Sequence, residues 1–299
     1  MSTLEQGQVV AAYSRQYLVE LLDGELLPCL THGKKSEVAC GDVVEIQRTG
    51  DAQGVIKKIS ARKSLLYRSD AFRQKLIAAN VTQIIFVVAA EPAFSDEVLT
   101  RCLIAAHNQQ LDTLIVLNKC DLLEQAKIAR AQLLTYNAIG YRVLELSAKN
   151  DIAPLRPFLQ GHSSVMVGQS GMGKSTFINA LLPDAHVSTR EISKALNSGK
   201  HTTTHARLYH LNESSHLIDC PGVQVFGLHH LGFGEIEEGF VEFSPYRGHC
   251  RYNNCRHTHE PNCALKQAVE SGAINARRMQ LFQEISQQTN RAHHPGRQN

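Results

Sequence analysis

The chain has 299 residues, of which 43% are hydrophobic and 20% charged, and its formal net charge is +3 at pH 7. This composition is typical of a folded protein of up to three domains and excludes an intrinsically disordered chain. No apolar run approaches the ~20 residues of a membrane span, and the first residues do not resemble a signal peptide. The sequence therefore predicts a cytoplasmic protein without a membrane partner.

The N-terminal part of the chain contains short apolar or alternating segments, which are QVVAAY, YLVELL, LLPCL, DVVEIQ and GVIKKI within residues 7–59. Turn signals such as Asp23-Gly24 separate them, and this pattern predicts β-strands. The strand number indicates a small closed barrel of the OB-fold type, a common nucleic-acid binder, although an SH3-like barrel fits the same pattern. A barrel can also be a scaffold alone. We assign residues 1–62 to this barrel.

The middle of the chain alternates strands and helices after a basic connector at residues 61–80. QIIFVVAA and TLIVLN are continuous apolar runs of the kind buried in parallel sheets, and RVLEL and SSVMVG continue the series. Helices are expected near residues 97–109, 124–138 and 174–182. This order predicts an α/β domain, which we place at residues 63–228. No strand is expected after Gly227, so residues 229–299 are predicted to form a helical C-terminal domain.

A complete Walker A motif, Gly168-x4-Gly173-Lys174-Ser175, lies between the strand-like SSVMV and the helix-like STFINALL. In this context the backbone N–H groups surround the β-phosphate, Lys174 contacts the β- and γ-phosphates, and the Ser175 hydroxyl ligates Mg²⁺. We therefore expect Lys174 and Ser175 to be catalytic as well as nucleotide-binding. The other predicted binding residues of this loop are Gln169, Ser170, Gly171, Met172 and Thr176.

The identity of the nucleotide base is predicted by Asn118-Lys119-x-Asp121, which begins at the last residue of TLIVLN. Ionised Asp121 can accept hydrogen bonds from the ring N–H and the exocyclic amine of guanine, whereas adenine does not offer this pair of donors. Ser147-Ala148-Lys149 follows RVLEL, and the backbone of Ala148 is expected to face the guanine oxygen. Together these motifs predict GTP as the ligand and disfavour a metabolic P-loop kinase.

Two further segments predict contacts with the γ-phosphate and its Mg²⁺. GKHTTT supplies a threonine, which is one of Thr202, Thr203 and Thr204, and Asp219-x-x-Gly222 supplies a carboxylate and an N–H group. The base-reading motif precedes the phosphate loop, so the order of motifs is that of a circularly permuted GTPase. This permutation makes the loop after Asp219 the tether of the C-terminal domain, through which the nucleotide state can reposition that domain.

A metal site is predicted by Cys250-x4-Cys255-x-His257-x5-Cys263. Three thiolates and one imidazole suit a closed, tetrahedral, structural Zn²⁺ site with one ion per chain. His249 and His259 are alternative fourth ligands, and His257 is preferred because its spacing to Cys255 is the tightest. From Pro245 onward, eight Lys or Arg stand against three acidic residues. This excess is compatible with a phosphate backbone as partner and equally with a solvated helix face.

The chain resembles the RsgA/YjeQ family of circularly permuted GTPases that depend on the small ribosomal subunit. The segments AANV, NKCDLL, GQSGMGKST, GKHTTT, DCPG and FGLHHL and the cysteine-histidine set carry this resemblance. It implies an OB-fold barrel, a central GTPase domain and a C-terminal zinc domain. It also implies binding to the small (30S) subunit and its 16S rRNA, and a role in late subunit maturation. We expect a monomer.

Catalysis needs a group that orients the attacking water, and Val223 stands where Ras-like enzymes have a glutamine. Hydrolysis is therefore expected to be slow alone and to rise when the subunit binds. His229 and His230 are candidates for the water-positioning group, and the resemblance favours His230. The alternative function is a GTP-controlled rRNA-binding module in which hydrolysis is incidental.

Overall fold

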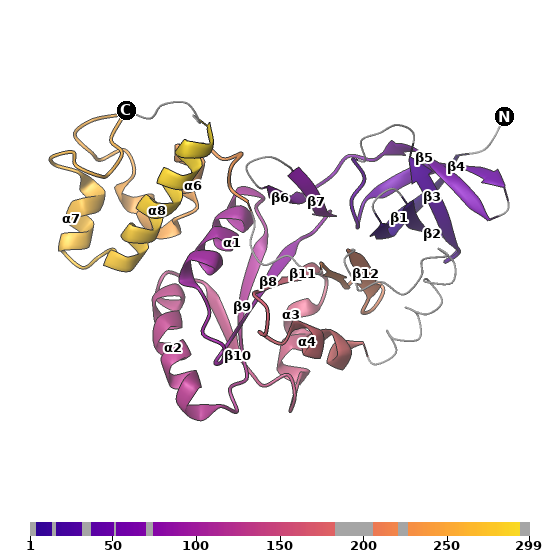
Figure 1. Cartoon of the computed structure of the whole chain (residues 1–299), viewed down its shortest axis with the longest axis horizontal. Helices are drawn as coiled ribbons and strands as arrows, with labels where there is room; N and C mark the ends of the chain where they lie inside the picture. The colour runs from indigo at the N-terminus through magenta and orange to yellow at the C-terminus, as the bar shows by residue number, and fades with distance from the viewer. Residues whose placement is uncertain are drawn as a thin grey trace.

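The computed structural model describes residues 4–13, 16–31, 37–50, 52–69, 74–182, 206–220 and 227–293. Figure 1 shows a barrel at the N-terminal end, a central sheet with helices, and a helical C-terminal region on the side of the central sheet away from the barrel. Among the described residues, none of the helices combines the length and the apolar character that crossing a membrane requires.

The N-terminal barrel is closed, because its first strand pairs with both the second and the fourth. The five strands are β1 (Leu4–Tyr13), β2 (Gln16–Leu21), β3 (Leu26–Thr31), β4 (Val43–Gly50) and β5 (Gln53–Ile59). Alternate side chains, including Val9, Val19 and Ile46, point inward and are fully buried. The predicted barrel of five strands is thereby confirmed.

The central sheet runs in the order β10-β9-β8-β11-β13-β12, and all neighbours are parallel except the edge strand β12. Its strands are β8 (Gln83–Ala89), β9 (Asp112–Asn118), β10 (Arg142–Glu145), β11 (Ser163–Val167), β12 (Arg207–His210) and β13 (His216–Asp219). Strands β8, β9 and β10 precede the phosphate loop in the chain, and β11, β13 and β12 lie next to them in the sheet. The two groups meet where β8 pairs with β11. The nucleotide motifs, although permuted in the sequence, therefore lie together at the carboxyl ends of the parallel strands.

The helices of the central region are α1 (Asp96–Asn108), α2 (Leu123–Ala138), α3 (Arg156–Leu159) and α4 (Lys174–Leu181). Helices α1, α2 and α4 agree with the predicted helices, whereas α3, which follows a short 3-10 turn at Ala153–Leu155, was not predicted. Helix α1 begins after Ser95, whose hydroxyl accepts a hydrogen bond from the N–H of Val98. This side chain satisfies one of the free N–H groups of the first turn, which fixes the start of α1.

Three strands were not predicted from the sequence. The basic connector contains an antiparallel pair, β6 (Leu65–Ser69) and β7 (Gln74–Ala79), and the edge strand β12 has only four residues. Basic residues interrupt the alternation in the first case, and β12 is too short to show a period. β12 also pairs with β1, since the N–H of Ala12 donates to the carbonyl of Ala206 at 3.2 Å. The barrel and the central sheet are thus hydrogen-bonded to each other.

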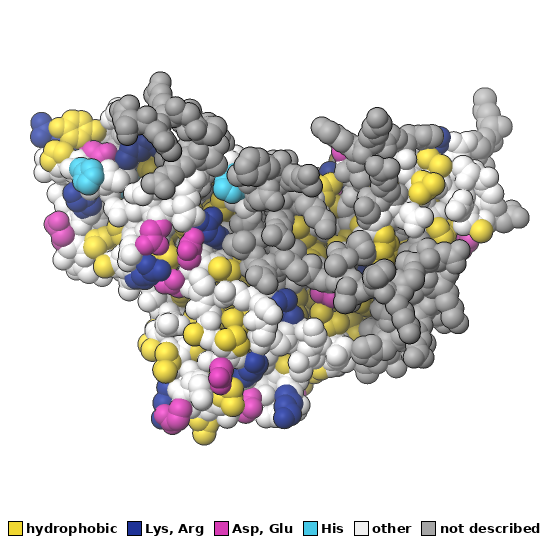
Figure 2. All heavy atoms as spheres, in the orientation of Figure 1, with side chains coloured by type: hydrophobic (Ala, Val, Ile, Leu, Met, Phe, Trp, Pro, Cys, Tyr) yellow, Lys and Arg dark blue, Asp and Glu magenta, His cyan; other side chains and the backbone are white. Residues whose placement is uncertain are grey.

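The described residues 227–293 of the C-terminal region form helices joined by loops and contain no strand, as predicted. It contains α6 (Phe233–Glu238), a 3-10 segment at Val241–Tyr246, α7 (Ala264–Glu270) and α8 (Ala276–His293). Phe240, Phe243 and Phe282 are completely buried, with ring centroids 5.0 to 5.3 Å apart. On the face shown in Figure 2, acidic and basic side chains are interspersed over the central and C-terminal regions. The positive charge of the C-terminal sequence is therefore not segregated on that face.

Candidate nucleotide site and metal centre

The predicted nucleotide motifs follow the carboxyl ends of four parallel strands. Asn118 ends β9, Ser147 lies after β10, the glycine-rich loop follows β11, and Asp219 ends β13. In open parallel sheets the carboxyl ends of the strands form the crevice where ligands bind. The fold therefore gathers all the described nucleotide motifs at one edge.

Asn118 connects three of the loops at this edge. Its side chain is almost completely buried, its Oδ1 accepts the N–H of Ala148 at 3.0 Å, and its Nδ2 donates to the carbonyl of Met172 at 2.9 Å. Its own carbonyl accepts the N–H of Ala90 at 3.0 Å. A single asparagine thus holds the base-reading loop, the Ser147–Lys149 loop and the phosphate loop in fixed relative positions.

The phosphate loop requires glycine at Gly173, the residue before α4. Gly173 has φ +93°, a conformation that disfavours any other residue. A Cβ at this position would lie 2.4 Å from Nδ2 of Asn118. The glycine therefore allows the close approach by which Asn118 binds the loop.

Lys174 is the first residue of α4, and its ammonium group bonds to the loop itself. Its Nζ donates to the carbonyl of Gly168 and, at 2.9 Å, to that of Gln169. Burial lowers the pKa of Lys174, and the charge of Asp219 opposes this; burial raises the pKa of Asp219, and Lys174 opposes that. The two groups therefore stabilise each other's charge where the phosphates and Mg²⁺ are expected. Ser175 and Thr176, in the same helical turn, are exposed and accessible to a ligand.

The base-reading side is arranged around an ionised carboxylate. The hydrogen bond from Ser147, with the charges of Lys149 and Lys119, lowers the pKa of Asp121. The carboxylate of Asp121 is thus ionised at neutral pH and can accept hydrogen bonds. Lys119 has φ +62° and donates from Nζ to the carbonyl of Glu91 at 2.6 Å.

Gln169 makes a contact that could not be predicted from the sequence. Its Oε1 accepts the N–H of Ser95 at 2.8 Å, so that the phosphate loop is bound to the start of α1. Gln169 occupies a position of the Walker A motif that any residue can fill, and its partner lies 74 positions away. No local pattern could have revealed this pair.

Several predicted residues lie outside the described residues or away from the sheet edge. Thr202, Thr203, Thr204, Gly222 and Val223 lie outside the described residues. His230 is partly buried in the segment that precedes α6. Burial lowers the pKa of His230, with Glu235 opposing this and His229 adding to it, so the imidazole is neutral at pH 7. A neutral imidazole can accept a proton, but the catalytic role of His230 stays a prediction.

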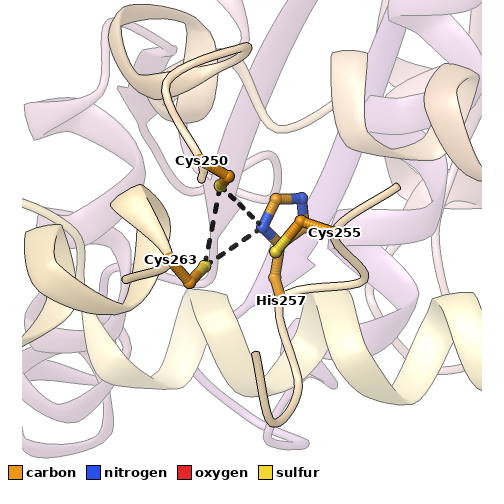
Figure 3. A group of neighbouring side chains, drawn as sticks. All are labelled: Cys250, Cys255, His257 and Cys263. Carbon is orange, nitrogen blue, oxygen red and sulfur yellow. Dashed lines mark hydrogen bonds between the residues drawn. The ribbon is translucent and has the colours of Figure 1, made fainter. Parts of the chain in front are cut away.

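The four predicted metal ligands come together in the C-terminal region (Figure 3). The ligand atoms of Cys250, Cys255, His257 and Cys263 all lie within 4.8 Å of one another. Nδ1 of His257 is 3.2 Å from Sγ of Cys263, and the Sγ atoms of Cys250 and Cys263 are 3.8 Å apart. Zn–S bonds of about 2.3 Å in a tetrahedron place two sulfurs about 3.8 Å apart. The four side chains therefore fit a closed tetrahedral metal site.

The surroundings orient His257 toward the cysteines. Its Nε2 lies 3.6 Å from Oε2 of Glu237 on α6, which leaves Nδ1 facing the sulfurs. Carboxylates of this kind commonly fix the tautomer of a metal-binding histidine. Glu260 accepts the N–H groups of three loop residues, Arg256, Thr258 and His259, and the resulting stabilisation lowers its pKa to about 2. The cluster includes His257 and neither His249 nor His259.

The comparisons with known proteins agree with these observations. The RsgA GTPase family model matches residues 59–229. The small ribosomal subunit biogenesis GTPase RsgA of Nitrosospira multiformis is 54% identical over 288 residues, which are 96% of this chain and 92% of that protein. The protein of the same name from Burkholderia pseudomallei is 51% identical over 285 residues, which are 94% of this chain and 91% of that protein.

Two solved structures extend the likeness to the whole fold. YjeQ from Thermotoga maritima superposes with a TM-score of 0.73 at 28% identity, covering 99% of this chain and 100% of that one. YloQ, described as a circularly permuted GTPase, gives 0.71 at 25% identity and covers 99% and 98%. These findings confirm the predicted resemblance and fold class. The chain belongs to the RsgA GTPase family.

Proposed function

We propose that the protein is a GTP hydrolase that acts in the biogenesis of the small ribosomal subunit and is stimulated by that subunit. The observation that carries the GTPase assignment is the buried Asn118, which fixes the phosphate loop and the guanine loop to each other. The ionised Asp121 adds selectivity for guanine. The relatives are about 50% identical to this chain, and their names support the ribosomal role.

The proposed hydrolysis uses the chain's own groups to bind and neutralise the phosphates. Lys174 would exchange its bonds to the carbonyls of Gly168 and Gln169 for bonds to phosphate oxygens. The Ser175 hydroxyl and a threonine of residues 202–204 would bind Mg²⁺, and Asp219 would contribute a carboxylate near the ion. The Mg²⁺ would neutralise further phosphate charge. His230 would position the attacking water when the subunit is bound.

The proposal also covers the structural metal and the partner. Three thiolates and an imidazole favour Zn²⁺ over the oxygen-preferring Mg²⁺ at the C-terminal cluster. The protein would act as a monomer in the cytoplasm. Its barrel and C-terminal region, which flank the GTPase domain (Figure 1), would contact 16S rRNA.

The test is GTP turnover by the purified protein with and without small ribosomal subunits. We expect slow turnover alone and a rise of several orders of magnitude at most with subunits, as for other trans-stimulated GTPases. If subunits bind more tightly in the presence of a GTP analogue while turnover stays unchanged, the alternative of a GTP-controlled rRNA-binding module is correct instead.

The guanine assignment predicts a change of base preference in Asp121→Asn. The amide presents an N–H donor where guanine needs an acceptor, whereas the second ring carbonyl of xanthine accepts from that donor. GTP affinity should fall by about 100-fold or more and xanthosine triphosphate affinity should rise. Competition of both nucleotides against a fluorescent GDP analogue measures the two affinities. Unchanged preference would show that another residue reads the base.

The water-positioning assignment predicts that His230→Ala binds GTP and small subunits normally but loses most of the stimulated turnover. Without the imidazole, about a 100-fold loss of stimulated kcat is expected for a missing acid-base group. His229→Ala is the matched control and should keep the stimulated rate. Full stimulation of His230→Ala would assign the water to the subunit or to another residue, while the GTPase assignment would stand.

A further inference from the structure

One face of helix α1 carries the C-terminal region. Asp96, Thr100, Ile104 and Asn108 recur every fourth residue and therefore lie along one side of the helix. Asp96 receives two hydrogen bonds from Arg277, at 2.7 and 2.9 Å, and Thr100 receives one from Arg278 at 2.8 Å. Asn108 donates to the carbonyl of Glu235 at 3.2 Å. The contacts thus run from the first turn of α1 to the last.

The middle of this interface is tightly packed. Arg278 is 1% exposed, pairs with Glu242 at 2.6 Å, and lies 4.5 Å from the ring centroid of Phe240. A Cβ on Gly239 would lie 2.9 Å from Ile104, so the backbone of the C-terminal region touches α1 directly. A buried, fully paired arginine is costly to separate from its partners. The C-terminal region therefore packs against α1. It is also connected to the central domain by the chain after Asp219.

The first turn of the same helix holds the phosphate loop. The N–H of Ser95 donates to Oε1 of Gln169, and Asp96 is the adjacent residue. The carboxylate that binds Arg277 and the N–H that binds Gln169 thus belong to adjacent residues. Because a hydrogen bond weakens steeply beyond about 3.2 Å, a shift of α1 by 1 Å would loosen the loop. Figure 1 shows α1 next to the C-terminal helices.

We propose that α1 couples the position of the C-terminal region to the phosphate loop, with Arg277 and Gln169 as positioning residues at its two contacts. Docking of the C-terminal region on a partner would then act on the phosphate loop through the N-terminal end of α1. This route is distinct from the tether after Asp219, and it does not require the buried contacts of Arg278 to open. The inference rests on the proposed function for the identity of the nucleotide.

A double-mutant cycle tests the coupling. Gln169→Met keeps the size of the side chain but removes the acceptor, and Arg277→Gln removes the ion pair. We expect GDP affinity to fall roughly 3- to 10-fold in the first variant and about 2- to 5-fold in the second. Since both act through the same turn, the double variant should bind GDP as weakly as Gln169→Met alone. Multiplicative losses would overturn the proposal, as would an unchanged affinity in either single variant.

Two comparisons separate a specific effect from general loosening. Arg247→Gln removes the same charge from an arginine that pairs with Glu238 inside the C-terminal region, and it should leave GDP affinity unchanged. GMP lacks the β-phosphate that the loop holds, so its affinity should not change in Gln169→Met. Equal losses for GMP and GDP, or a loss in Arg247→Gln, would indicate general destabilisation and reject the coupling. Asp96→Asn breaks the same ion pair if Arg277→Gln does not fold.

Failure of this proposal and failure of the proposed function give different results. If the parent protein binds GDP in preference to ADP and the cycle is multiplicative, only the coupling is rejected. If the parent protein shows no preference for guanine, the proposed function itself is wrong. With subunits present, the variants should also show a lower stimulated kcat at saturating GTP than Arg247→Gln, because the coupling acts on the bound state.

Discussion

Asn118→Ala should weaken GDP and GTP binding by about 100- to 1,000-fold. The substitution removes the bonds to Ala148 and Met172, and it leaves that N–H and that carbonyl without their partner in a buried setting. Each unmade buried bond costs about 1 to 3 kcal/mol. Both losses destabilise the arrangement of the loops that bind the nucleotide. The loss should therefore appear in nucleotide binding more than in the unfolding of the sheet.

Asn118→Asp is the matched variant for this experiment. It keeps an acceptor for the N–H of Ala148 but has no donor for the carbonyl of Met172, so its affinity should lie below that of the parent. Titration calorimetry with GDP measures both variants, and circular dichroism checks the fold. Near-parental GDP affinity in Asn118→Ala would mean that the nucleotide itself organises the loops.

The nucleotide motifs could be predicted from the sequence because each is a local arrangement. Gly173 is needed for its own backbone conformation, and Lys174 and Ser175 follow it within one helical turn. The apolar runs before these motifs predicted parallel strands, and β8 is indeed buried at every residue. Local chemistry and burial thus sufficed for the sheet and its loops.

Contacts between distant parts of the chain could not be predicted in the same way. The bonds from Ser95 to Gln169 and from Arg278 to Thr100 join residues 74 and 178 positions apart. Neither residue type nor spacing marks such partners before the fold is known. The strand β12, whose pairing with β1 joins the barrel to the central sheet, was missed because its four residues are too few to show a period.

The choice among the histidines near the cysteines was made from spacing, and the structure agrees with it. The sequence offers His249, His257 and His259 within a few residues of Cys250 or Cys255. In the structure His257 has φ +59° and is 5% exposed, with Glu237 on one side and the sulfurs on the other. The histidine that was preferred for its spacing to Cys255 is thus the one inside the cluster.

Cys255→Ser should release the structural metal and destabilise the C-terminal region. A structural zinc site contributes its binding free energy to folding, and Cys255 and Cys263 belong to the buried core of this region. His257 lies 5.9 Å from Phe282, ring centroid to ring centroid, so disorder at the site reaches the core directly. We expect loss of about one zinc per chain and a separate, earlier thermal transition for this region.

The same site predicts a pH dependence of zinc affinity. Burial raises the pKa of the Cys255 thiol to about 12, so in the metal-free protein this thiol is protonated at neutral pH and its proton must leave when zinc binds. Acidification favours the protonated, metal-free state, and zinc affinity should therefore fall from pH 8 to pH 6. Competition with a chromophoric chelator at each pH measures this, together with metal analysis of the variants. His259→Ala should keep its zinc, whereas undiminished zinc in Cys255→Ser, or loss of zinc in His259→Ala, would show that a different set of side chains binds the ion.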